Sequence, residues 1–270
     1  MAYLPVIYLE DVKYKFGYRR SLFDYLKKQE IEAALFVLQP TLDISDTLMP
    51  ETLYAIKEVS SLGDSFGIKA IWGFYMDFHE DDLLHKLVIP KNEKGMRAIL
   101  SKLISVRRNE LYITHFEKYL ESNRFDFFIG ERIQLTAEDH RGVRKNVKNR
   151  RKNRANGLTD FEVNCWADFF EKYIGDLDFV YNTVCSKKDY LSDYVYSVYR
   201  KLMEDGISLV TLPRIACNIW PYESTYNSPQ KIQGELELVG TYPANSFDAK
   251  WVIDGVEDID ALSIVDEVWR

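Results

Sequence analysis

Three short apolar runs, separated by amphipathic stretches, constrain the fold of this chain more than any other feature. The runs at 4–9 (LPVIYL), 33–38 (AALFVL) and 68–75 (IKAIWGFY) are continuous and rich in strand-forming residues. Such runs are typical of strands that are buried on both faces. The stretches between them, 18–29 and 50–62, place apolar residues at helical spacing. This alternation predicts a parallel sheet with crossover helices.

The rest of the chain continues the alternation less regularly. The pattern predicts further helices at 93–120, 161–173 and 190–203, and further strands at 125–129 and 207–212. Two late segments and the last residues indicate short strands, a hairpin or a final helix; these segments are 236–239 and 251–253. Because no linker, repeat or low-complexity segment interrupts the pattern, we predict one α/β domain with a Rossmann-like central mixed sheet flanked by helices.

Composition excludes several classes of protein. The net charge is −7, with 35 basic and 42 acidic residues, which argues against general coating of nucleic acid. The 3 cysteines are widely spaced and form no C-x-x-C motif, so we expect no disulfide framework or zinc site. The N-terminus lacks the features of a signal peptide, and no apolar run reaches the ~18 residues of a membrane span. We therefore expect a cytoplasmic protein without a membrane span.

The segment DFHEDD, at 77–82, directly follows the third predicted strand. In an extended segment Asp77 and His79 lie on the same side, because side chains alternate with period two. Carboxylate oxygens with one imidazole suit Mg²⁺ or Mn²⁺. The alternative interpretation is a solvated acidic loop.

A second candidate follows the apolar run at 125–129. We expect the strand to stop there and the chain to turn at Gly130 into the charged pair Glu131 and Arg132. A carboxylate at the end of a buried strand can hold a metal ion, bind a ribose or act as a general base. Glu131 is therefore a candidate for catalysis and for metal binding.

The most basic segment runs from Arg141 to Arg154 and contains no acidic residue. On a helix, Arg144, Lys148 and Arg151 lie close to one face. Like charges at this spacing repel one another, so phosphates of a nucleotide donor or of a nucleic-acid acceptor would be suitable partners. The alternative is a solvated surface helix that balances an acidic protein.

A further candidate is a carboxylate pair at the start of the predicted helix at 190–203. Asp193 follows Asp189 by four residues, so both can lie on one helix face as a base and its neighbour. A capping carboxylate with core tyrosines is the alternative.

Three segments resemble the GT-A glycosyltransferases. Residues 5–39 resemble the first strand, helix and second strand of that family. FDFFIGERIQL (125–135) resembles the strand that ends in a metal-binding D-x-D, and 189–215 resembles a later helix and strand near the acceptor site. The likeness spans about residues 4–225, and in place of D-x-D this chain has Gly130-Glu131-Arg132.

This resemblance implies a GT-A-like fold and transfer of a sugar from a nucleotide-sugar donor to a hydroxyl, on a glycan or on nucleic acid. Residues 1–130 would then form a nucleotide-binding half and residues 131–270 an acceptor-binding half. Mg²⁺ or Mn²⁺ would be the cofactor. The implied site residues are Asp77, His79 and Glu131 for the metal, Asp11 and Asp43 for the nucleoside, Arg144, Lys148 and Arg151 for phosphate, and Asp193 and Glu131 for catalysis.

Residues 131–173 also resemble the FemABX-type GNAT acyltransferases, in a strand, a basic helix, and a following strand and helix. That likeness implies an acyl- or aminoacyltransferase. A third interpretation is a non-catalytic protein whose basic helix binds DNA or RNA, with aromatic residues available for base stacking.

Overall fold

The structure is a computed structural model, and it describes ten segments of the chain. These are residues 4–9, 16–38, 48–77, 85–105, 122–132, 178–184, 209–213, 215–218, 231–234 and 249–269. They form the elements β1 (Val6–Tyr8), α2 (Phe16–Lys28), β2 (Ala33–Leu38), α3 (Leu48–Phe66), β3 (Lys69–Asp77), β4 (His85–Pro90), α4 (Glu93–Ser105), η2 (Arg124–Asp126), β5 (Phe127–Arg132), β6 (Phe179–Val184), β7 (Leu209–Pro213), β8 (Ile215–Asn218), β9 (Lys231–Gly234), α9 (Lys250–Gly255) and α10 (Ala261–Trp269).

The centre of the molecule is a seven-stranded mixed sheet whose strands follow chain order from β1 to β7. All neighbouring strands are parallel except β4, which is antiparallel to both β3 and β5. The prediction of a central mixed α/β sheet is therefore confirmed. Its finer form, a Rossmann-like and GT-A-like arrangement, is not confirmed, since the strand order has no point at which it reverses.

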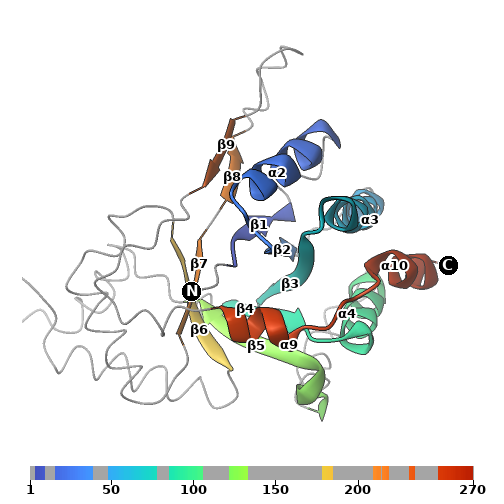
Figure 1. Cartoon of the computed structure of the whole chain (residues 1–270). Helices are drawn as coiled ribbons and strands as arrows, with labels where there is room; N and C mark the ends of the chain where they lie inside the picture. The colour runs from blue at the N-terminus through green and yellow to red at the C-terminus, as the bar shows by residue number, and fades with distance from the viewer. Residues whose placement is uncertain are drawn as a thin grey trace, which may run out of the picture.

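Each face of the sheet has its own buried cluster. Ala34, Phe36 and Trp72 belong to a cluster that includes residues of α2, α3, α4 and α10. Figure 1 shows these four helices together on one side of the sheet. We call this side the outer face. All residues of β2 are buried. Helices cover the outer face, and side chains of other strands and of α9 pack together on the opposite face.

The opposite, inner face carries the second cluster. It contains alternate residues of the strands, among them Leu35, Ile71 and Leu87, together with Val252 of α9 and Val256 beyond it. Helix α9 lies against β4 and β5 (Figure 1). Backbone N–H of Glu257 donates to the carbonyl of Lys91, just after β4, at 2.7 Å. Residues 249–256 therefore cover the inner core near the edge where the parallel strands begin.

The two ends of the strand order approach each other. β8 starts two residues after β7 ends, pairs antiparallel with β9, and contacts β1. Ile215 of β8 is buried in the same cluster as Ile7 of β1. β8 therefore links the two ends of the strand order through the outer-face cluster.

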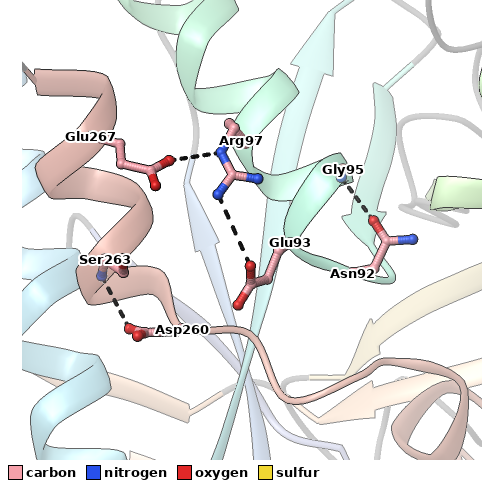
Figure 2. A network of polar contacts seen from close by, with 7 residues as sticks. All are labelled: Asn92, Glu93, Gly95, Arg97, Asp260, Ser263 and Glu267. Carbon is pink, nitrogen blue, oxygen red and sulfur yellow. Dashed lines mark hydrogen bonds and ion pairs between the residues drawn. The ribbon is translucent and has the colours of Figure 1, made fainter.

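Helix α10 packs on α3 and α4. Polar contacts fix the first turns of α4 and α10 at this junction (Figure 2). Nε of Arg97 on α4 donates to Glu267 at 2.8 Å. The Asn92 side chain accepts from the N–H of Gly95 at 2.9 Å, and Asp260 accepts from the N–H of Ser263 at 3.0 Å. Such side-chain acceptors satisfy amide groups that a first helical turn leaves unpaired.

The predicted strands at 4–9, 33–38, 68–75 and 207–212 and the helices at 18–29 and 50–62 are confirmed in type, with small shifts of their ends. The helix at 93–120 is confirmed as far as Ser105. The predicted elements at 161–173, 190–203 and 236–239 lie outside the described residues. Among the described residues, no helix combines the length and apolar character needed to cross a membrane.

One prediction about β5 is wrong. The strand does not turn at Gly130 but continues through Glu131 to Arg132. The physical reason is the neighbouring strand, because a Cβ at position 130 would lie 2.3 Å from Cε2 of Phe179. Glycine here makes room for an aromatic ring within the sheet, which is a second role that glycine has in strands.

Lys69 should tether α9 to the sheet. Its ammonium group donates to the carbonyl of Ile253 at 3.2 Å and to the carbonyl of Val256, both at the end of α9. Replacing Lys69→Met should lower the free energy of unfolding by about 1–2 kcal/mol, since partly buried carbonyls lose charged donors. Urea unfolding measures this loss. Lys57→Met, which removes only the partly exposed pair with Asp266, should cost less than about 1 kcal/mol; equal losses would contradict the tether.

Candidate functional site

The carboxyl edge of the sheet collects polar residues from three neighbouring strands. The parallel strands end there, and ligands of open α/β sheets bind beyond that edge. Because β4 is antiparallel, it begins where β3 and β5 end. The first residue of β4, His85, is consequently brought to the same edge as Asp77 of β3 and Arg132 of β5.

The strand register defines which of these residues are neighbours. Asp77 pairs with His85 across β3 and β4. Lys86 pairs with Glu131 across β4 and β5. Arg132 pairs with Tyr181 across β5 and β6.

Strand alternation assigns these positions to the two faces. Tyr75, Leu87 and Phe179 are buried in the inner-face cluster. Positions two residues along each strand belong to the same face. Asp77, His85 and Tyr181 are thus inner-face positions, and so is Arg132, which follows the inner-face residue Phe128 by four.

We call Asp77, His85, Arg132 and Tyr181 the inner edge row. Lys86 and Glu131, one residue away on β4 and β5, are outer-face positions by the same alternation. The inner edge row contains a carboxylate, an imidazole, a guanidinium and a phenol. Arginine is a residue type that binds anions, and the other three residue types can transfer protons.

Two of the residues predicted as candidates for metal binding occupy positions on different faces of the sheet. Asp77 is an inner-face position and Glu131 is an outer-face position. The third predicted ligand, His79, lies outside the described residues. The other predicted site residues also lie outside them, and their roles stay predictions; they are Asp11, Asp43, Arg144, Lys148, Arg151 and Asp193.

Sequence reasoning missed His85 and Tyr181, because it predicted neither β4 nor β6. Both strands are short, and β4 ends in proline. Arg132 was noted only as part of a charged pair after a turn. If the predicted strand had been extended beyond Gly130, the period-two alternation from Phe128 would have placed Arg132 on the inner face.

A network of charged residues fixes the opposite, amino end of β5. Asp178, just before β6, accepts from the guanidinium of Arg124 at 2.7 Å and from the N–H of Ile129 at 2.6 Å. Its own N–H donates to the carbonyl of Ile129 at 2.8 Å. We call Asp178 and Arg124 the β5–β6 clamp, since they join the strands that carry Arg132 and Tyr181.

Asp126 holds the start of β5 to the turn before α4. Its carboxylate accepts from Lys94 at 2.6 Å and from the amide of Asn92 at 3.0 Å. The hydrogen bond from Lys94, followed by that from Asn92, lowers the pKa of Asp126 below its ordinary value. No group of three or more histidine, cysteine or acidic residues in the described part of the chain is arranged to hold a metal ion.

Comparison with known proteins finds matches among solved structures. No protein-family model and no curated protein match the chain. One matching solved structure comes from Bifidobacterium adolescentis and bears the provisional name metal-dependent phosphoesterase. It is 10% identical, the match covers 72% of this chain and 80% of that chain, and the TM-score is 0.34.

The predicted glycosyltransferase function is wrong. The matching structure bears the name of a phosphoesterase and not of a glycosyltransferase. The strand order also lacks the reversal point at which a Rossmann-like sheet binds its nucleotide. At this identity and TM-score the name assigns no activity to this chain. The acyltransferase and nucleic-acid interpretations rest on residues 131–173 and 141–154, of which only Glu131 and Arg132 are described.

The lowered pKa of Asp126 predicts a pH-dependent contribution to stability. A carboxyl group with a lowered pKa in the folded state stabilises the protein above its unfolded pKa, near 3.8, and loses this effect as the pH falls through the folded value. Asp126→Asn should therefore cost about 1 kcal/mol at pH 7 and less at pH 3. Urea unfolding at both pH values measures the difference. A cost that does not shrink at pH 3 would contradict this assignment. Asp24→Asn, at an exposed position of α2, is the control.

Proposed function

We propose that the inner edge row binds a phosphate ester and hydrolyses it. One observation supports the proposal: the register gathers Asp77, His85 and Arg132 on one face at the carboxyl edge of three adjacent strands. Guanidinium groups match phosphate oxygens in a two-point geometry. A carboxylate and an imidazole beside them supply the proton transfers that hydrolysis requires.

The proposed reaction has a defined balance. Water attacks the phosphorus atom, the bond between phosphorus and the ester oxygen breaks, and the leaving alcohol takes up a proton. Arg132 binds the phosphate and offsets the charge that accumulates on its oxygens in the transition state. Without a bound cation, Asp77 and His85 are the groups available to orient the water and to move its proton.

The predicted Mg²⁺ or Mn²⁺ belongs to this proposal. The carboxylate of Asp77 and the imidazole of His85 are donors that suit such ions. The described residues offer only these two in the inner edge row, so phosphate oxygens and water would complete the coordination, as is common for Mg²⁺. A bound cation supplies charge neutralisation and lowers the pKa of a coordinated water.

The proposal predicts loss of hydrolysis from the inner edge row. Asp77→Asn and His85→Gln should each reduce kcat on bis(p-nitrophenyl) phosphate, with Mn²⁺ present, by about a hundredfold or more. Arg132→Gln should raise KM by about tenfold, because a charged hydrogen bond to phosphate is lost. Release of p-nitrophenol measures both effects, and p-nitrophenyl phosphate tests monoesters in parallel.

Two outer-face variants sharpen this test. Lys86→Gln, next to His85 in sequence but on the other face, should leave kcat and KM within about twofold. Glu131→Gln tests the site that was predicted from the sequence. A large loss of kcat in this variant would favour that site, whereas an unchanged kcat would favour the inner edge row. The proposal would be overturned if the protein hydrolysed neither of the two esters. It would also be overturned if Lys86→Gln reduced kcat as much as His85→Gln does.

A further inference from the structure

We infer that the contact between Gly130 and Phe179 positions Arg132 beside Tyr181 in the inner edge row. This inference rests on the proposed function. Gly130 and Phe179 are register partners, and Arg132 and Tyr181 are partners two residues further along the same strands. Gly130 and Phe179 lie two residues before the edge, so they are positioning residues.

The first constraint is the fit of the Phe179 ring over the backbone of β5. Phe179 is 1% exposed, and Gly130 is its neighbour on the inner face. A Cβ at position 130 would lie 2.3, 2.4 and 2.8 Å from Cε2, Cζ and Cδ2 of that ring. Any other residue at position 130 would force the ring or the strand to move, because protein cores are close-packed.

The second constraint prevents the ring from moving away. Trp251 of α9 meets Phe179 edge-on, with ring centroids 5.7 Å apart and planes at 75°. The same indole meets Phe128 of β5 at 5.3 Å and 88°. Gly255 at the end of α9 lies so close to Phe128 that a Cβ there would be 2.6 Å from Cζ. Helix α9 therefore holds the aromatic residues of β5 and β6 from the inner side.

The third constraint fixes the register at the amino end of both strands. The β5–β6 clamp bonds both backbone groups of Ile129 to Asp178, the residue that precedes Phe179. From this point the strands pair without interruption to Arg132 and Tyr181. A slip of one residue would move Arg132 to the other face of the sheet, because side chains alternate along a strand.

These constraints act on Arg132 only through the backbone. A side chain at position 130 should displace β5 from β6 at the point where the inner edge row begins. Displacement of a binding group by about 1 Å can reduce activity by about a hundredfold. A substitution at Gly130 should therefore weaken phosphate binding by more than its loss of folding stability alone would explain.

The experiment compares two inner-face glycines, with inorganic phosphate as the probe. Gly130→Ala should weaken phosphate binding, measured by isothermal titration calorimetry, by about tenfold or more. Gly73→Ala is the matched control, since its Cβ would meet flexible ends of Leu87, Leu35 and Val37 at 2.9, 3.1 and 3.3 Å. It should lower the melting temperature and leave phosphate affinity within about twofold, because β5 and β6 are not displaced.

Rescue separates positioning from general loss of structure. Phe179→Leu removes the overlapping ring, so the double variant Gly130→Ala with Phe179→Leu should recover phosphate affinity to within about threefold of the original chain. Equal losses of affinity in Gly130→Ala and Gly73→Ala, or no recovery in the double variant, would overturn the inference. If Arg132→Gln binds phosphate as the original chain does, the proposed function itself fails, and the inference fails with it.

A second pair of variants applies if Gly130→Ala does not fold. Asp178→Asn weakens the β5–β6 clamp without adding bulk, and it should reduce phosphate affinity by about threefold or more. Asp126→Asn is its control, because Asp126 bonds to Lys94 and Asn92 at the start of β5 and makes no bond to β6 among its described contacts. Equal phosphate affinities in these two variants would overturn the inference.

Discussion

The direction of β4 is the constraint on which the candidate site depends. The other six strands of the sheet run parallel, so their carboxyl ends meet at one edge. By running antiparallel between β3 and β5, β4 brings its own first residue, His85, to that edge. A parallel strand at this place would have put His85 at the far edge, where the clamp and α9 lie. The juxtaposition of Asp77, His85 and Arg132 is therefore a consequence of one strand reversal.

The two edges of the sheet have different roles. At the amino edge, α9 covers the inner core and the β5–β6 clamp fixes the register, so this edge contributes stability. At the carboxyl edge, the inner-face positions of β3, β4 and β5 are Asp77, His85 and Arg132. Such a division between a stabilising edge and a chemical edge is common in α/β proteins. It explains why Phe179 and Trp251, which are far from Arg132 in sequence, bear on the position of Arg132.

The elements predicted from the sequence are those whose burial produces a strong pattern of apolar residues along the chain. β1, β2 and β3 are continuous apolar runs, and α2 and α3 have an amphipathic period, so all five were predicted in type. β4 and β6 were missed because a short strand among charged residues has little local signal. Asp77 was predicted as a site residue from its place after a strand. His85 could not be, since its approach to Asp77 depends on a pairing between strands that no local pattern contains.

Engineered disulfides test the register at the carboxyl edge most directly. Opposed residues in an antiparallel pair have Cα atoms about 4.5–5.5 Å apart, within the range that a disulfide spans. In a chain whose 3 native cysteines are replaced, Asp77→Cys with His85→Cys should form a disulfide on mild oxidation, detected by mass spectrometry. Asp77→Cys with Lys86→Cys should not, because these positions belong to opposite faces. Cross-linking of the second pair in preference to the first would contradict the account.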